Sequence, residues 1–159
     1  MEKQEKTNVM RILEQHKITY NSYTYDPVEA LSGMEVSAAL NQNPEQVFKT
    51  LVTVGASKQN YVFVVPVCSE LNLKKAAKAV GEKNIAMIKS KELLPLTGYI
   101  HGGCSPIGMK KQFTTVIDET AQLWDTIIFS GGRIGYQVEV SIEDLAKIIP
   151  FKLEDIACE

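Results

Sequence analysis

The sequence is poor in the residues that carry covalent or metal chemistry. Its 159 residues include three cysteines and two histidines, and the cysteines are widely spaced, with no Cys-x-x-Cys pair. An odd number of scattered cysteines argues against a disulfide framework, and two histidines add little to a zinc site. We therefore expect a protein that uses no metal and no other cofactor.

Long apolar runs are also absent. The longest, residues 61–67, has the length of a strand, and no apolar core follows the charged residues at the N-terminus. A membrane-spanning helix needs about 20 apolar residues, and a secretory leader needs an apolar core of its own. The sequence thus predicts a cytoplasmic protein without a membrane partner. Its length, with 45% apolar and 23% charged residues, predicts one domain over residues 1–159.

The net charge of −2 hides an uneven distribution of charge. Residues 49–111 hold ten lysine or arginine residues and three acids, a balance of +7, whereas the rest of the chain holds seven and sixteen, a balance of −9. This segregation predicts a basic face that touches a limited part of a polyanion. The alternative is that the lysines are solvated on separate surfaces.

Hydrophobic periodicity predicts an alternation of short helices and strands. Helices are expected at residues 3–16, 33–40, 73–80, 90–94 and 142–149, the second and the last after capping boxes that begin at Ser32 and Ser141. Leu73 is expected to face the core, and Pro95 to end the helical turn before it. Strands are expected at 19–25, 47–54, 61–67, 85–88, 113–117, 126–130 and 134–140. The pattern predicts an α+β fold in which helices flank a mixed, largely antiparallel or barrel-like sheet.

A glycine-rich stretch, His-Gly-Gly-Cys-Ser-Pro-Ile-Gly-Met-Lys-Lys at residues 101–111, is the best candidate for a site. Three glycines and a proline within residues 102–108 exclude the middle of a helix or a central strand. Main-chain N–H groups in such a loop can point at a carbonyl, a ribose or a phosphate, and the two lysines that follow would suit an anionic ligand. An ordinary connecting loop is the alternative.

Lys49 is the most informative single residue. Strand alternation places it in an apolar row with Val47 and Leu51, so that it either reaches out from an edge of the sheet or projects into a pocket. Cys104 lies in the glycine-rich stretch, three residues after His101, and a Cys/His nucleophilic pair is a minor alternative. Catalysis is otherwise expected to work by positioning and by backbone donors.

Three other residues could line a pocket or could have an ordinary structural role. Tyr25, at the end of a predicted strand, fits either role. Gln137 alternates with apolar neighbours and faces either solvent or a cavity. Arg133, in a Gly-Gly-Arg turn, is a phosphate contact or a solvated turn residue.

Four blocks of sequence, in order and at matching spacing, make the chain recognisable. They are Asn-Pro-Glu-Gln-Val-Phe-Lys-Thr-Leu at 43–51, Leu-Lys-Lys-Ala-Ala-Lys at 73–78, Thr-Gly-Tyr-Ile-His-Gly-Gly-Cys-Ser-Pro-Ile-Gly at 97–108, and Ser-Gly-Gly-Arg at 130–133 followed by Val-Glu-Val at 138–140. The chain resembles the YbaK family of aminoacyl-tRNA deacylases, relatives of the editing domain inserted in bacterial prolyl-tRNA synthetases. The likeness runs from about Arg11 to Ile156.

The resemblance implies a mixed sheet flanked by helices, with a pocket for the 3′-terminal aminoacyl-adenosine of a tRNA. It implies hydrolysis of Cys-tRNA(Pro), in which the substrate's own thiol attacks the ester and displaces the tRNA as a thiolactone. The implied partners are the aminoacyl-tRNA and, transiently, prolyl-tRNA synthetase. A deacylase for another small aminoacyl group, such as Ala-tRNA(Pro), and a non-catalytic protein that binds a tRNA end or nucleotide stay open as alternatives.

The family pattern also assigns roles to residues. The resemblance implies catalytic roles for Lys49 and Gly102. It implies substrate binding by Tyr25, Ser32, Thr50, Gly103, Ser105, Pro106, Gly108 and Gln137. The basic residues expected near the tRNA are Lys74, Lys75, Lys78, Lys110, Lys111 and Arg133.

Two positions depart from the family pattern. Gln137 stands where an aspartate is common, and Ser32 where a phenylalanine is expected. Glutamine keeps hydrogen-bonding capacity but loses the negative charge, which leaves the amino-acid and tRNA preference open.

Overall fold

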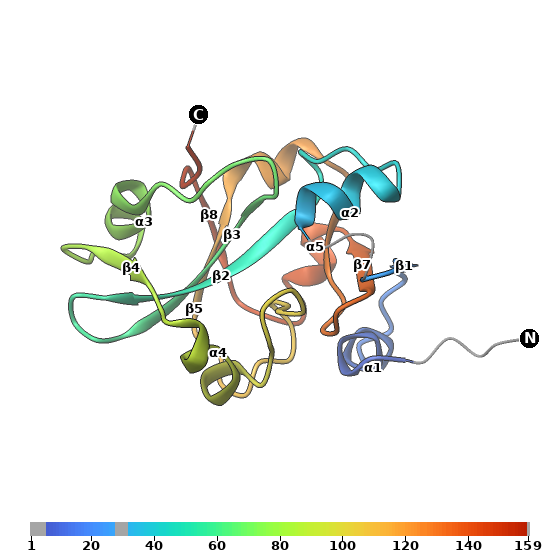
Figure 1. The fold of residues 1–159 in the computed structure, drawn as a ribbon, viewed down its shortest axis with the longest axis horizontal. Helices are drawn as coiled ribbons and strands as arrows, with labels where there is room; N and C mark the ends of the chain where they lie inside the picture. Colours follow the sequence, from blue (N-terminus) through green and yellow to red (C-terminus); the bar gives the residue numbers. More distant parts are fainter. Residues whose placement is uncertain (1–5, 28–31, 159) are drawn as a thin grey trace, which may run out of the picture.

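The computed structural model describes residues 6–27 and 32–158. Its elements are α1 (Asn8–Gln15), β1 (Asn21–Thr24), α2 (Gly33–Ala39), β2 (Phe48–Gly55), β3 (Asn60–Pro66), α3 (Leu73–Val80), β4 (Ile85–Met87), α4 (Ser90–Thr97), β5 (Thr114–Asp118), the 3-10 helix η1 (Glu119–Leu123), β6 (Ile127–Ser130), β7 (Tyr136–Val140), α5 (Ile142–Leu145) and β8 (Lys152–Glu154) (Figure 1).

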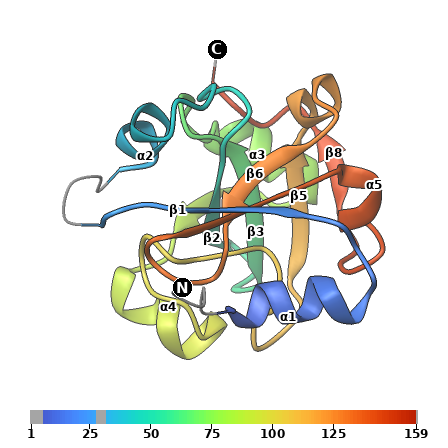
Figure 2. The same ribbon diagram turned by 90° about the vertical axis from the view of Figure 1, so that its right-hand side faces the viewer.

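The strands form two sheets that meet at one backbone bridge. The larger sheet has the order β4-β2-β3-β5-β8, and the smaller has the order β1-β7-β6. Strand β3 pairs with β5, and β5 with β8, in parallel, whereas the other pairs are antiparallel. Val47, just before β2, bridges Ile128 of β6, and the Ile128 N–H donates to the Gln46 carbonyl at 3.1 Å. The predicted α+β class with mostly antiparallel strands is confirmed. Figure 2 looks onto the smaller sheet, with the larger one behind it.

Strand β3 is the centre of the larger sheet, and its alternation separates two cores. Val62 and Val64 point into the larger core, which includes Leu13 of α1 and Val138 of β7. Tyr61, Phe63 and Val65 point into a smaller core with Ala76 and Ala77 of α3. We call the two sides of this sheet the larger-core face and the α3 face. In Figure 1, α3 lies above the sheet and α4 below it.

Local capping signals in the sequence are confirmed. The Ser32 hydroxyl accepts from the Glu35 N–H, and the Ser141 hydroxyl accepts from the Asp144 N–H, each at 3.1 Å. These bonds satisfy N–H groups that have no partner within the helix. Helix α3 has its predicted bounds and ends at Gly81, whose φ of 73° is the left-handed cap that glycine favours.

Several predicted details are wrong. Helix α4 does not stop at Pro95 but continues to Thr97, because Leu93 and Leu96 pack against the larger core and the Thr97 hydroxyl donates to the Leu93 carbonyl at 2.7 Å. Leu73 is 43% exposed, because it begins α3 beside the buried stripe formed by the two alanines.

The predicted ends of the chain's elements also need correction. Helix α1 begins at Asn8 because the Thr7 side chain caps it, accepting from the Met10 N–H; the earlier part of the prediction, residues 3–5, lies outside the described residues. Helix α5 ends at Leu145 rather than at residue 149. The strand at 134–140 is not the last, since three residues of β8 pair with β5.

Candidate functional site

The glycine-rich stretch is a built loop between α4 and β5. The Tyr99 hydroxyl donates to the Ile107 carbonyl, and the Ile107 N–H donates to the Ser105 hydroxyl at 3.3 Å. Ser105 is completely buried, and Pro106 is buried beside it. Gly108 has a φ of +81°, and a Cβ there would lie 2.8 Å from the Tyr99 hydroxyl oxygen. These residues shape the loop, so they serve a structural role whether or not a substrate touches them.

Gly103 of this loop packs against the turn between β6 and β7. A Cβ on Gly103 would lie 3.1 Å from the backbone nitrogen of Ile134, so this contact requires glycine. The Gly103 N–H donates to the Ile100 carbonyl at 3.0 Å and is therefore engaged. Gly102 is exposed, has a φ of +88°, and donates to no backbone carbonyl within the described ranges. Gly102 thus has an N–H group that could donate to a ligand. Gly103 allows the loop and the β6–β7 turn to approach each other closely.

Tyr25 reaches the same turn from the other side. Its N–H donates to the Gly135 carbonyl at 3.0 Å, and a Cβ on Gly135, whose φ is +97°, would lie 3.3 Å from the Tyr25 carbonyl oxygen. The side chain of Tyr25 is half-buried. The β6–β7 turn therefore brings together Tyr25 and the Gly102–Gly103 pair, which lie far apart in the sequence.

Gln137 faces neither bulk solvent nor an apolar core. It is 5% exposed, and its carboxamide oxygen accepts a hydrogen bond of 2.7 Å from the Gln42 Nε2. Gln42 follows α2, where its N–H donates to the Ser37 carbonyl at 2.8 Å. The solvent-facing alternative for Gln137 is therefore wrong. Gln42 itself escaped the sequence reasoning, because nothing in its own neighbourhood indicates a partner 95 residues away.

Lys49 and Thr50 point to opposite faces of β2. Lys49 shares the α3 face with Leu51, and its Nζ lies 3.6 Å from the carboxylate of Glu70, a side chain that is 84% exposed. Thr50 shares the larger-core face with Phe48 and Val52, and its buried hydroxyl has no hydrogen-bond partner in the described part of the chain. Of these two residues Lys49 alone carries a charge, and the structure gives it a loose partner that a ligand could replace.

The Glu139 carboxylate links several elements around the site by hydrogen bonds. Its carboxylate accepts from the Tyr23 and Thr126 hydroxyls at 2.5 Å each and from the side-chain amides of Asn21 and Gln46 at 3.4 Å. Burial raises the pKa of this carboxyl, but the hydrogen bonds from Thr126, Tyr23 and Asn21 outweigh it and lower the pKa. The network joins β1, β6 and β7 to the segment that leads into β2 and Lys49.

Cys104 is unsuited to act as a nucleophile. It is 9% exposed, and burial raises the pKa of its thiol to about 12. Since the thiolate is the nucleophilic form, this cysteine is inert at neutral pH. The neighbouring Tyr99 also has a pKa raised to about 12, by burial and then by the charge that Cys104 would carry.

The basic residues predicted near the tRNA fall into two groups. Lys74, Lys75 and Lys78 lie on α3, where the Lys75 ammonium is 3.0 Å from the Asp155 carboxylate. The glycine loop lies on the other face, because Tyr99, Cys104 and Ile107 belong to the larger core.

The second group stays close to the loop. The Lys110 side chain lies over Gly98, where a Cβ would be 3.3 Å from its Cγ. The Lys111 ammonium is 5.9 Å from the centre of the Phe113 ring, and the Arg133 guanidinium is 5.5 Å from that of Tyr136. The structure thus brings Lys110, Lys111 and Arg133 to the glycine loop and its contact turn, and it does not bring the lysines of α3 there.

Two general expectations can be compared with the described residues. Among them, no three His, Cys, Asp or Glu side chains form a group that could hold a metal ion. No helix in the same ranges has the length and apolarity needed to span a membrane.

Known proteins are similar to this chain in sequence and in fold. Residues 29–148 match the family described as "Aminoacyl-tRNA editing domain". A curated protein of Enterococcus faecalis, named "Putative Cys-tRNA(Pro)/Cys-tRNA(Cys) deacylase EbsC", is 47% identical over 146 residues, which cover 91% of this chain and 89% of the relative.

Two solved structures share the fold. One, described as a "putative trans-editing enzyme for prolyl tRNA synthetase", has a TM-score of 0.81 at 21% identity and covers 98% of this chain and 100% of its own. The other, described as a hypothetical protein, has a TM-score of 0.82 at 20% identity over 94% of this chain and 99% of its own. At such identities the likeness concerns the fold alone. The family match over three quarters of the sequence, together with the relative at 47% identity, shows that this chain belongs to the aminoacyl-tRNA editing domain family.

Proposed function

We propose that this chain is a cytoplasmic, single-domain trans-editing deacylase that hydrolyses mischarged Cys-tRNA(Pro). The relative at 47% identity carries the name of a deacylase for cysteinyl-tRNAs. The observation that carries the proposal is exposed Gly102, whose N–H donates to no backbone carbonyl in the described ranges and which lies in a built loop whose only thiol is buried with a pKa raised to about 12. A site of this kind supplies positioning and a backbone donor, and it leaves the nucleophile to the substrate.

The reaction that fits this site uses the thiol of the cysteinyl group. The thiol sulfur attacks the ester carbonyl carbon, a carbon–sulfur bond forms, and the bond from that carbon to the ribose oxygen breaks. The thiol proton ends on the ribose oxygen, so the products are tRNA with a free 3′ end and a cysteine thiolactone, which water then opens. The Gly102 N–H would donate to the carbonyl oxygen as it gains negative charge.

Lys49 would hold the nucleotide end of the substrate. Within the described ranges its ammonium has one ion-pair partner, the exposed Glu70 carboxylate at 3.6 Å. This contact is weak in water and is easily exchanged for a phosphate or a ribose hydroxyl. The charge is available without breaking a buried ion pair, which suits a residue that binds and releases a polyanion.

A deacylase for another small aminoacyl ester, such as Ala-tRNA(Pro), is the second candidate. The Gly102 N–H would serve this ester as well, and the neutral Gln42–Gln137 pair does not separate the two candidates, because both aminoacyl groups carry the same ammonium. The two candidates differ in their nucleophile, since alanine has no thiol and its ester requires water.

The decisive experiment follows the hydrolysis of Cys-tRNA(Pro) and Ala-tRNA(Pro) side by side, with a seryl-tRNA as control. Rapid loss of the cysteinyl ester alone supports the first candidate. Loss of the alanyl ester supports the second. If neither ester is hydrolysed faster than in buffer, both enzyme proposals fail, and a non-catalytic protein that binds a tRNA end takes their place.

We also propose that the chain meets prolyl-tRNA synthetase transiently, as a free-standing editing protein must capture its substrate after release. Co-sedimentation of the two proteins with and without tRNA(Pro) tests this. A ternary complex is expected with tRNA, and its absence at every concentration would remove the proposal.

A further inference from the structure

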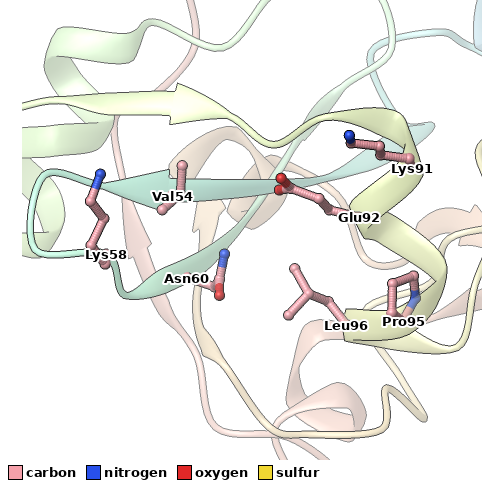
Figure 3. Close-up of a pocket in the computed structure, with 7 residues that line it drawn as sticks. All are labelled: Val54, Lys58, Asn60, Lys91, Glu92, Pro95 and Leu96. Carbon is pink, nitrogen blue, oxygen red and sulfur yellow. The ribbon is translucent and has the colours of Figure 1, made fainter.

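A groove lies on the larger-core face, between the end of the β2–β3 hairpin and α4 (Figure 3). Its volume is about 540 Å³. Val54 of the hairpin and Pro95 and Leu96 of α4 give it apolar walls, and Lys58 and Lys91 stand at its two sides. None of these residues was singled out by the sequence patterns as part of a site.

The two lysines of the groove form no ion pair among the described residues. Both are exposed, and no carboxylate among the described residues lies within the 4.0 Å that defines an ion pair with either ammonium. Glu92 lines the groove as well, yet it pairs with neither of them. The groove therefore offers two free cations next to an apolar wall.

Lys58 has an unfavourable backbone conformation. Its φ is 76°, in the left-handed region that glycine and asparagine adopt far more readily than lysine. A turn that needs this conformation would be better served by glycine, so the lysine is not explained by the turn. Its side chain at the groove is the remaining reason for a lysine there.

The groove and the glycine loop are joined by α4. This helix has eight residues, about 12 Å at 1.5 Å per residue, and runs from the groove through Gly98 into the loop. Lys91 lies in its first turn, and the Lys110 side chain lies over Gly98 at its other end. Cations thus stand at both ends of α4, whose Leu93 and Leu96 pack against the larger core, whereas the lysines of α3 lie on the opposite face of the sheet.

We propose that this groove binds the phosphate backbone of the tRNA 3′ strand, beyond the terminal adenosine. Lys58 and Lys91 would contact phosphates, and the apolar wall would receive a ribose or base. The inference rests on the proposed function, since it needs a tRNA whose 3′ end reaches Gly102. It favours the lysines beside α4 over those of α3, because α4 leads through Gly98 directly into the glycine loop.

The test compares two substrates and two pairs of substitutions. The double variant Lys58→Gly with Lys91→Ala removes both charges and places glycine where the backbone favours it. Its matched control, Lys74→Ala with Lys78→Ala, removes two exposed lysines of α3. Each protein is assayed on full-length Cys-tRNA(Pro) and on 3′-cysteinyl-adenosine, which has no upstream phosphates.

For full-length tRNA we expect the groove variant to raise KM by on the order of tenfold at 0.15 M salt, with kcat unchanged. The slope of log KM against log salt concentration should fall by about 1.5, because two phosphate contacts are lost. The minimal substrate and the α3 control should show no change. Equal behaviour of wild type and groove variant on tRNA would overturn the proposal, and so would an equal loss on both substrates.

A binding measurement separates this inference from the proposed function. Uncharged tRNA(Pro) is titrated onto the wild type and both double variants, without any reaction. Weaker binding by the groove variant alone supports the groove even if no ester is hydrolysed. If only a complex with prolyl-tRNA synthetase weakens, the groove is a protein-docking surface and the tRNA assignment is wrong.

Discussion

The side-chain amide of Gln42 donates a hydrogen bond of 2.7 Å to the carboxamide oxygen of Gln137, which lies on a strand 95 residues further along the chain. The bond fixes the end of α2 against the face of β7 that also carries Glu139. It also occupies the oxygen of Gln137, so the free side of this carboxamide is its N–H₂ group, a hydrogen-bond donor.

Removing this partner should destabilise the fold. We expect Gln42→Ala to lower the free energy of unfolding by about 1–3 kcal/mol, because the buried oxygen of Gln137 would lose its donor. Denaturant titration measures the change. The matched control is Gln122→Ala, which shortens an exposed glutamine on η1 and should change stability by less than about 0.5 kcal/mol. Equal small effects of both substitutions would mean that the Gln42–Gln137 bond contributes little.

Glu139 should make the fold sensitive to acid. Its pKa is lower in the folded state than the ordinary 4.5, so the folded state binds fewer protons than the unfolded chain. The resulting stability is present above pH 4.5 and is lost as the pH falls through the lowered folded value. We expect Glu139→Gln to be less stable at pH 7 and to lose less stability between pH 5 and pH 3. Glu154→Gln, at an exposed position of β8, should keep the wild-type slope.

Much of the architecture could be predicted because its signals are local. Ser32 and Ser141 cap the helices that follow them, and Gly81 ends α3 where the pattern ends. The failures depend on distant packing. Helix α4 continues past Pro95 because Leu93 and Leu96 contact the larger core. Three residues of β8 form a strand only because β5 lies beside them.

The residues of the site also fall into those that local sequence signals predict and those whose surroundings depend on distant packing. The glycines around Gly102 predict a loop of defined shape, because only glycine adopts these backbone conformations easily. The surroundings of Gln137 are a different matter, because strand alternation says which residues share a face but not what covers that face. Only the fold shows that Gln42, after α2, covers it, and which core each face of β2 lies against.

Gly108 should tolerate no side chain. A Cβ would meet the Tyr99 hydroxyl at 2.8 Å, and its φ of +81° already disfavours other residues. Gly81 is the matched control, since its φ of +73° is similar but nothing lies within 4 Å of the added atom. We expect Gly81→Ala to cost about 1 kcal/mol, from backbone strain alone. Gly108→Ala should cost at least 1 kcal/mol more and should reduce deacylation, because the clash moves the loop. Equal costs in thermal unfolding would show that the loop absorbs the methyl group.

Lys49→Ala should abolish deacylation and leave the fold intact. In the part of the chain that the structure describes, the ammonium makes one loose ion pair, with exposed Glu70, and such pairs contribute about 0–1 kcal/mol. The midpoint of thermal unfolding should therefore stay close to that of the wild type, whereas kcat/KM should be lost. Lys49→Arg keeps the charge but changes its shape, and partial activity is expected if the role is to hold a phosphate or ribose. An unchanged rate with alanine would remove Lys49 from the site.

Cys104→Ala should retain activity, because the thiol of this loop is not the nucleophile. Burial raises its pKa to about 12, above the value of 9.0 that a free thiol has. The neutral thiol is thus favoured in the fold, and it stabilises the fold below pH 9.0 but loses this advantage at higher pH, where the unfolded chain ionises. The alanine variant should therefore be less stable at pH 7, by about 1 kcal/mol for the lost buried contacts, and should lose less stability between pH 8 and pH 10. Its rate on Cys-tRNA(Pro) should stay within about twofold of the wild type, since the attacking sulfur belongs to the substrate. A folded variant with no activity would instead make Cys104 the nucleophile and would require the loop to open before each turnover.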